Sequence, residues 1–381
     1  MTGTAPLARS VDGGREREPV PAWARAPADA LARAARGACG VVVALRRGDE
    51  RAVVPYGTTA YGGPEPVTAA TRFEIGSLTK CFTALLLAEE AVRGEIGYGD
   101  PLGRFLPPGI LPAERGGPIT LLHLATHTSG LPRLPPGLLA EAAGVWFANP
   151  YARFSGDDLL RSLARTRPGS APGERVRYSN FGVGLLGHLL TRAVPGGPAY
   201  GALLAERVLG PLGLRSTGDD PLLPQATGYW HGRPRPPWRI PGLPGAGSLR
   251  STGPDLLALL DALADAAAEA DPGNDPDGRR SGVRGSDGRG SGVLGAALAD
   301  TVRPRLALRG GTRRLALVWN IRVRPEGPVY HHSGGTRGFT AFAGFAPRHR
   351  TAVVALANTT PAADQRFLQG AYNTLITLHR G

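Results

Sequence analysis

The sequence predicts an α/β fold, more narrowly α+β: an antiparallel sheet built from both chain ends, with flanking helices and an inserted, mostly helical subdomain. Three observations support this prediction. β-Branched and alternating apolar runs occur near both ends of the chain, whereas the middle shows helical periodicity. The hydrophobic content of 42% is enough for a large core. We expect a disordered tail over 1–22, followed by a single domain over 23–381.

The N-terminal part predicts a β-hairpin followed by a helix. The runs CGVVVAL (39–45) and AVVPYG (52–57) flank the polar hexapeptide RRGDER, which is typical of a turn between two strands. Residues 77–93 place apolar side chains on one helical face, and Gly94 is expected to end that helix.

The middle of the chain predicts a helical subdomain over 95–235. Amphipathic segments at 157–166, 180–193 and 199–213 alternate with loops rich in proline and glycine. A further helix is expected over 249–270, with Ser251 or Thr252 as its N-cap.

The last third of the chain predicts a flexible insertion, three strands and a final helix. Residues 271–295 contain much glycine and balanced charge, as expected for a flexible low-complexity insertion. The strands are expected at 314–323, 339–347 and 351–358, and the helix at 362–379.

Composition argues against several functional classes. The net charge of +13 comes from scattered arginines, which favours a solvated basic surface over a nucleic-acid face. Two cysteines form neither a disulfide framework nor a metal cluster. The chain shows no apolar stretch suited to a signal peptide or a membrane span, so we expect a cytoplasmic protein without membrane or nucleic-acid partners. The composition does not indicate an oligomeric state.

Lys80 is the only lysine, and the other 43 of the 44 basic residues are arginine. It stands three residues after Ser77 at the start of an apolar helix, so the hydroxyl and the amine are expected on one helical face. A buried lysine can lose its proton and act as a base toward serine, which arginine cannot do. The alternative is an ordinary helix residue beside a serine N-cap.

Two other segments carry polar groups next to apolar elements. Tyr178 and Asn180 precede a helix and offer a phenol and an amide, although Asn180 as a simple N-cap is the alternative. Gly334 and Gly335 lie near His332 at a strand edge, where glycine marks close approach of another backbone or a ligand. A β-bulge or turn is the alternative reading of these glycines.

Together these elements resemble the serine β-lactamase and penicillin-binding protein superfamily, within the branch of class C β-lactamases, D,D-peptidases and related esterases. The family's motifs are Ser-x-x-Lys, Tyr-x-Asn and Lys-Thr-Gly or His-Thr-Gly, and they stand here as SLTK (77–80), YSN (178–180) and HSG (332–334). The resemblance runs from about residue 37 to the C-terminus. It implies a serine hydrolase that cleaves an ester or amide of a small molecule or peptide through an acyl-enzyme, without a metal or other cofactor.

The resemblance also implies a role for each motif residue. Ser77 is expected to be the acylated nucleophile, Lys80 the general base, and Tyr178 the relay that protonates the leaving group. Asn180 is expected to contact both the acyl side chain and Lys80. The backbone amides of Ser77 and Gly335 are expected to form an oxyanion hole.

The third motif departs from the β-lactamase pattern. His332 stands where β-lactamases of this branch have a lysine, and Ser333 and Gly334 complete the substrate-binding strand. A histidine is expected to be only partly charged at neutral pH, with help from Arg337. This pattern favours a D,D-peptidase, a D-aminopeptidase or a general serine hydrolase over an efficient β-lactamase.

Other readings of the chain remain open. His123 and His127 have the spacing of a zinc-binding helix, but Leu124 replaces the expected glutamate, so core histidines are favoured. The Gly-x-Ser-x-Gly elbow of α/β-hydrolases is absent around Ser248. The same acyl-enzyme could serve an acyltransferase or peptide cyclase. A slowly deacylating β-lactam or peptide sensor is the alternative of another class.

Overall fold

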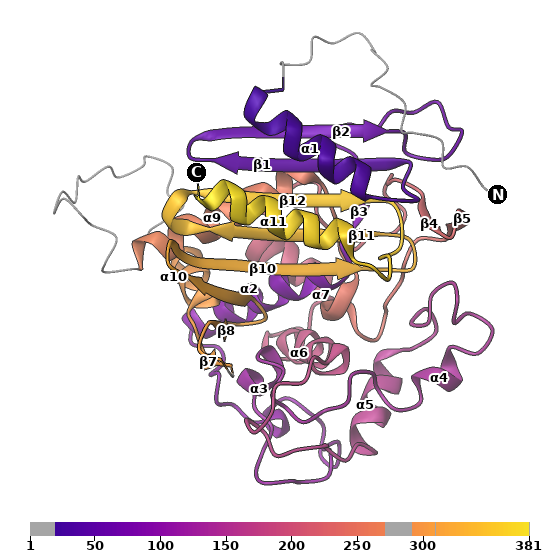
Figure 1. The fold of residues 1–381 in the computed structure, drawn as a ribbon. Helices are drawn as coiled ribbons and strands as arrows, with labels where there is room; N and C mark the ends of the chain where they lie inside the picture. The colour runs from indigo at the N-terminus through magenta and orange to yellow at the C-terminus, as the bar shows by residue number, and fades with distance from the viewer. Residues whose placement is uncertain (1–19, 271–291, 309, 381) are drawn as a thin grey trace, which may run out of the picture.

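The computed structural model describes residues 20–270, 292–308 and 310–380. An antiparallel sheet of eight strands runs through these residues (Figure 1). In spatial order its strands are β2 (Glu50–Gly57), β1 (Gly40–Arg47), β12 (Thr351–Ala357), β11 (Thr340–Ala346), β10 (Gly327–Gly335), β9 (Asn320–Arg324), β8 (Arg313–Leu315) and β7 (Leu306–Ala307). Because β1 pairs with β12, the predicted sheet built from both chain ends is confirmed.

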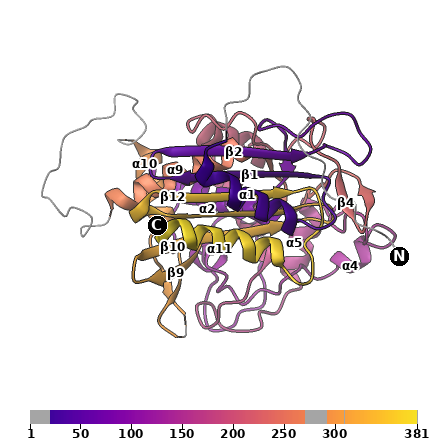
Figure 2. The ribbon, with the colours of Figure 1, turned by 45° about the horizontal axis from the view of Figure 1, so that its top comes forward.

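Helices cover both faces of the sheet, which explains why the central strands read as continuous apolar runs. Helices α1 (Ala22–Ala34) and α11 (Arg366–Arg380) pack together on one face (Figure 2). On the other face lie α2 (Thr79–Val92), α9 (Gly253–Glu269) and α10 (Val293–Val302), and α10 contacts both of the others. Two apolar clusters, one on each side of the sheet, fill these layers.

The remaining elements are short helices and two small two-stranded sheets. Two of the helices, α3 and α6, are packed against each other. The helices are α3 (Leu121–Ala125), α4 (Leu138–Glu141), α5 (Gly156–Ala164), α6 (Asn180–Ala193), α7 (Tyr200–Leu204) and α8 (Pro244–Gly247). The small sheets pair β3 (Phe73–Glu74) with β6 (Arg250–Ser251), and β4 (Gly228–Trp230) with β5 (Arg233–Arg235). No helix of the described residues combines the length and apolarity needed to cross a membrane.

The structure corrects the sequence analysis at three places. The run 314–323 is not one strand, because it folds into β8, a turn and β9. The turn residues 316–319 are buried, so the apolar pattern continues across it. Helix α1 was not expected. Helix α10 begins at Val293, inside the predicted insertion 271–295. Most of that insertion and of the predicted tail 1–22 lies outside the described residues.

Candidate active site

Ser77 lies in a single 3₁₀ turn, Gly76–Leu78, that leads directly into α2. Its side chain is partly exposed, whereas Lys80, one turn later, is fully buried. Lys80 Nζ lies 2.9 Å from Ser77 Oγ, as the i to i+3 spacing predicts. The solvent-accessible hydroxyl is therefore in direct contact with a buried amine.

Burial makes Lys80 suited to accept a proton. It lowers the pKa of the Lys80 amine to about 7, and the nearby Arg133 acts in the same direction. The carbonyl oxygen of Ala246 in α8 accepts a hydrogen bond from Lys80 Nζ at 2.5 Å. A neutral amine held in this way keeps its lone pair available for the hydroxyl of Ser77.

Tyr178, which stands just before α6, contacts the same hydroxyl. Its Oη donates a hydrogen bond to Ser77 Oγ at 2.6 Å. Burial raises the pKa of Tyr178 to about 12, so the phenol keeps its proton at neutral pH. Tyr178 is fixed by its neighbour Ser179, which caps α6 by accepting from Gly182 N at 2.8 Å. Ser179, and not Asn180, is thus the N-cap.

Asn180 does not make the predicted contact with Lys80. Its Nδ2 donates to Tyr151 Oη at 3.1 Å. Its Oδ1 is buried without a hydrogen-bond partner. A buried acceptor without a donor is costly, and such groups are found where a ligand completes the hydrogen bonding. The amide therefore has one acceptor, Oδ1, that is free for a donor.

Strand β10 packs against the turn that carries Ser77, and glycines make this approach possible. A Cβ on Gly334 would lie 2.0 Å from Ile75 O and 2.9 Å from Ser77 N. A Cβ on Gly76, whose φ is +49°, would lie 2.6 Å from Gly335 N. The prediction that these glycines mark close approach of another backbone is confirmed. The two amides expected to bind an oxyanion thus come from adjacent backbones.

His332 differs from the sequence-based expectation. The imidazole is buried, with an exposed fraction of 4%, and its Nδ1 has no hydrogen-bond partner. Burial lowers the pKa of His332 to about 3, and the proximity of Lys80 adds to this. The ring is neutral at pH 7, not partly charged, because the buried pocket disfavours a second cation. The neighbouring Ser333 and Gly335 are exposed along the strand.

The two histidines of HLATH lie in different local structures. His123 Nδ1 takes part in the capping box of α3 with Thr120. Helix α3 ends at Ala125, and His127 adopts a left-handed φ of 58° beyond it. His127 Nδ1 accepts from Ser179 N at 3.3 Å. The spacing of a zinc-binding helix is therefore not realised, and the described residues contain no group of three or more candidate metal ligands.

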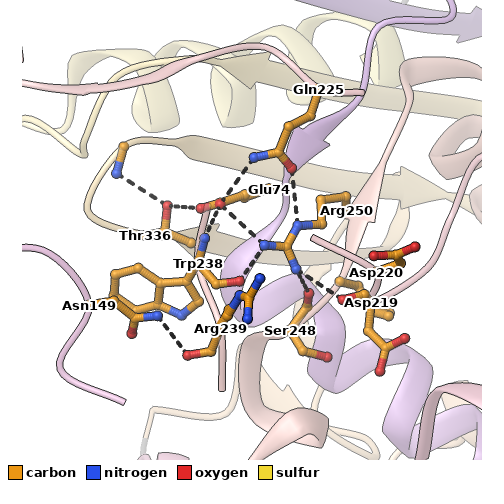
Figure 3. A network of polar contacts seen from close by, with 12 residues as sticks. Glu74, Asn149, Asp219, Asp220, Gln225, Trp238, Arg239, Ser248, Arg250 and Thr336 are labelled. Carbon is orange, nitrogen blue, oxygen red and sulfur yellow. Dashed lines mark hydrogen bonds and ion pairs between the residues drawn. The ribbon is translucent and has the colours of Figure 1, made fainter. Parts of the chain in front are cut away.

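A buried polar network joins the strand before Ser77 to the loop after Gly335 (Figure 3). Glu74, three residues before Ser77, accepts a hydrogen bond from Thr336 Oγ1 at 2.7 Å. Its other oxygen accepts from Trp238 N at 2.6 Å and lies 3.5 Å from Arg250 Nη2. The sequence analysis missed this network. A signal was present, since Glu74 stands between Phe73 and Ile75 in a run otherwise suited to the core.

We predict that Thr336→Val lowers kcat about tenfold, because the Thr336–Glu74 bond holds the position of Gly335 relative to Ser77. Thr217→Val is the matched control, since Thr217 Oγ1 also donates to a carboxylate, Asp255 Oδ2, at 2.8 Å. Melting temperatures and kcat would be measured for both variants. An equal loss of kcat in both would show that Thr336 contributes stability and not the geometry of the site.

Comparisons with known proteins show the family of this chain. The sequence matches the family model described as Beta-lactamase over residues 28–376. The D-alanyl-D-alanine-carboxypeptidase/endopeptidase AmpH of Escherichia coli is 34% identical over 183 residues, which cover 48% of this chain and 45% of that protein. The chain thus matches less than half the length of this relative. A beta-lactamase of Providencia stuartii is 26% identical and covers 90% of this chain and 87% of that protein.

Solved structures show the same fold. A beta-lactamase/D-alanine carboxypeptidase from Pseudomonas syringae superposes with a TM-score of 0.72 at 22% identity, covering 92% of this chain and 99% of that chain. A class C beta-lactamase gives a TM-score of 0.73 at 22% identity, covering 93% and 96%. The fold class and the resemblance predicted from the motifs are confirmed. With the family match extending over most of its length, the chain belongs to the β-lactamase family.

Proposed function

We propose that the protein is a serine hydrolase that cleaves an ester or amide through an acyl-enzyme on Ser77. The observation that carries this proposal is the buried Lys80, whose pKa is lowered to about 7 and whose Nζ lies 2.9 Å from Ser77 Oγ. Few structural roles explain a fully buried, unpaired lysine in direct contact with an accessible hydroxyl. Family membership and the names of the relatives support the same class of reaction.

Each group of the site has a step in the proposed reaction. Lys80 accepts the proton of Ser77 while Oγ attacks the substrate carbonyl, and the backbone amides of Ser77 and Gly335 stabilise the developing oxyanion. The protonated phenol of Tyr178 donates to the leaving oxygen or nitrogen as the bond to it breaks. The proton on Lys80 then restores the phenol. A water molecule, activated by Lys80 and Tyr178, then attacks the acyl-enzyme and releases the acyl group as a carboxylic acid.

A substrate panel tests the proposal. It comprises p-nitrophenyl esters, D-aminoacyl anilides and a chromogenic cephalosporin, and we expect turnover of an ester or anilide in preference to the cephalosporin. The reason is the neutral His332, which supplies no fixed positive charge where β-lactamases of this branch have a lysine. A burst without turnover would favour the sensor, and turnover only with an added alcohol or amine would favour the acyltransferase.

The pH dependence gives a separate prediction. We expect kcat/KM for the best substrate of this panel to rise with a slope near one below about pH 7 and to level off above it, because Lys80 must lose its proton. No fall is expected up to pH 10, since the pKa of Tyr178 is raised to about 12. Initial rates measured across pH 5–10 in buffers of constant ionic strength give this profile. A fall between pH 8 and 10 would contradict the role of a protonated phenol.

A further inference from the structure

Arg337 lies within cation–π distance of two tryptophan rings near the candidate active site. Its guanidinium carbon is 5.7 Å from the ring centroid of Trp146 and 5.7 Å from that of Trp230. The side chain is half-buried, and among residues 20–270, 292–308 and 310–380 it has no hydrogen bond or ion pair. A half-buried cation without an anionic partner is unusual, because burial penalises its charge.

The indole rings restrict the orientation of this cation. Trp230 stacks on Phe147 with ring centroids 5.6 Å apart. The strand that carries Trp230 is fixed to the loop of Arg337, since Tyr229 N donates to Gly338 O at 3.1 Å. Aromatic rings attract a guanidinium through its flat faces, which leaves the N–H groups at its edge free. Those edge donors match a carboxylate in bidentate geometry.

The position of Arg337 along the chain places it on the acyl side of the site. His332 lies near Tyr178, with ring centroids 6.4 Å apart, so the start of the motif is next to the group that protonates the leaving atom. Gly335 follows, and Arg337 lies beyond it, at most about 7 Å of extended backbone further on. A substrate with its leaving group at Tyr178 therefore extends its acyl group toward Arg337.

Tyr151 supports this placement. Its hydroxyl accepts the hydrogen bond from Asn180, the residue expected to contact the acyl group. Burial raises the pKa of Tyr151, and both Arg133 and Arg337 oppose that effect through their charge. Arg133 lies over the ring of Tyr178 at 5.3 Å. The acyl side of the site thus faces two cations, and Arg337 is the one that lies near two tryptophan rings.

We propose that Arg337 selects substrates whose acyl group ends in a carboxylate, such as half-esters or half-amides of dicarboxylic acids. This inference rests on the proposed acyl-enzyme at Ser77 and names its substrate class. The carboxylate lies at the far end of the group that becomes bound to Ser77, not on the group that leaves. An acyl chain of about six carbons has a reach comparable to the backbone distance between Gly335 and Arg337.

The first experiment compares p-nitrophenyl hydrogen adipate with p-nitrophenyl hexanoate, which differ in a terminal carboxylate against a methyl group. We expect the wild-type ratio of kcat/KM, adipate to hexanoate, to be at least about 10, and Arg337→Gln to lower this ratio about 10- to 100-fold. Arg337→Glu should bring it below one. Arg235→Gln, which removes another guanidinium over Trp230, should leave the ratio unchanged.

The second experiment measures binding without catalysis. Adipate is titrated into the Ser77→Ala protein, and the fluorescence of the tryptophans beside Arg337 reports the complex. We expect saturable binding that Arg337→Gln in the same background weakens at least about tenfold. If the wild type hydrolyses neither ester while adipate still binds through Arg337, the proposed function fails and the carboxylate site stands. The carboxylate site is overturned if the wild type hydrolyses both esters with a kcat/KM ratio near one and Arg337→Gln does not weaken adipate binding.

Discussion

Ser77→Ala is expected to abolish covalent labelling by a fluorophosphonate or a fluorescent penicillin and to lower turnover at least about 10⁴-fold. The physical reason is that Ser77 Oγ is the accessible hydroxyl on which both Lys80 Nζ, at 2.9 Å, and Tyr178 Oη, at 2.6 Å, converge. Without this oxygen no acyl-enzyme can form, although the amides of Ser77 and Gly335 remain in place. Labelling is measured by in-gel fluorescence and by intact-protein mass.

Ser216→Ala is the control for this experiment, because it removes a hydroxyl from a serine outside the site. It should retain labelling and turnover. Folding of the Ser77→Ala protein is checked by its melting temperature, which should stay close to that of the wild type since the side chain is partly exposed. Persistent labelling of a correctly folded Ser77→Ala protein would refute the assignment of the nucleophile.

Lys80→Arg is expected to be nearly as inactive as Ser77→Ala. Arginine retains positive charge but does not lose its proton in proteins, so it cannot accept the proton of Ser77. The larger guanidinium could also disturb the buried pocket beside Ala246 O, to which Lys80 Nζ donates at 2.5 Å. Lys80→Met therefore serves as a second variant, because it fills a similar volume without charge. Retained turnover in either variant would exclude Lys80 as the base.

Lys80→Met should be inactive and yet more stable than the wild type. The pKa of Lys80 falls from 10.5 to about 7 on folding, so burying its charge opposes folding. At pH 7 this penalty is on the order of 4 kcal/mol, and loss of the hydrogen bond to Ala246 O offsets about 1 kcal/mol of the gain.

The sign of this effect gives its pH dependence. The wild-type penalty is fully present below about pH 7, decreases as the pH rises toward 10.5, and is lost above that. The stability advantage of Lys80→Met over the wild type should therefore be largest below pH 7 and shrink at alkaline pH. Urea denaturation at pH 6, 8 and 9.5 measures it. If this advantage does not change with pH, the pKa of Lys80 is not lowered on folding.

Local patterns in the sequence predicted most of the fold. The apolar runs that became β1, β11 and β12 are long and continuous because both faces of the sheet are covered. Helix α6 spans Asn180–Ala193, as the periodicity predicted. The prediction failed at residues 316–319, where a buried turn carries the same apolar residues as a strand. A turn that is buried lacks the polar signal by which turns are recognised.

In the candidate site too, contacts between neighbours in the chain could be predicted, whereas contacts between distant segments could not. The spacing of Ser77 and Lys80 is local, so one helical turn brings them together whatever the rest of the chain does. Asn180 was expected to reach Lys80 but donates to Tyr151, a residue from another segment. Glu74, Arg250 and Thr336 were missed because their contacts join residues far apart in the chain. No periodicity records such a pairing.

The sequence by itself determined which groups make up the candidate site: a lone lysine, a serine one helical turn away, and glycines that admit a second backbone. Only the tertiary structure decided their charge states. Burial lowers the pKa of Lys80 to about 7 and that of His332 to about 3, and it raises the pKa of Tyr178 to about 12, because packed neighbours exclude water from each. The fold also brings Arg337 to 5.7 Å from the ring centroids of Trp146 and Trp230, two residues far from it in the chain. Desolvation depends on everything that surrounds a group, and those surroundings are assembled from the whole chain.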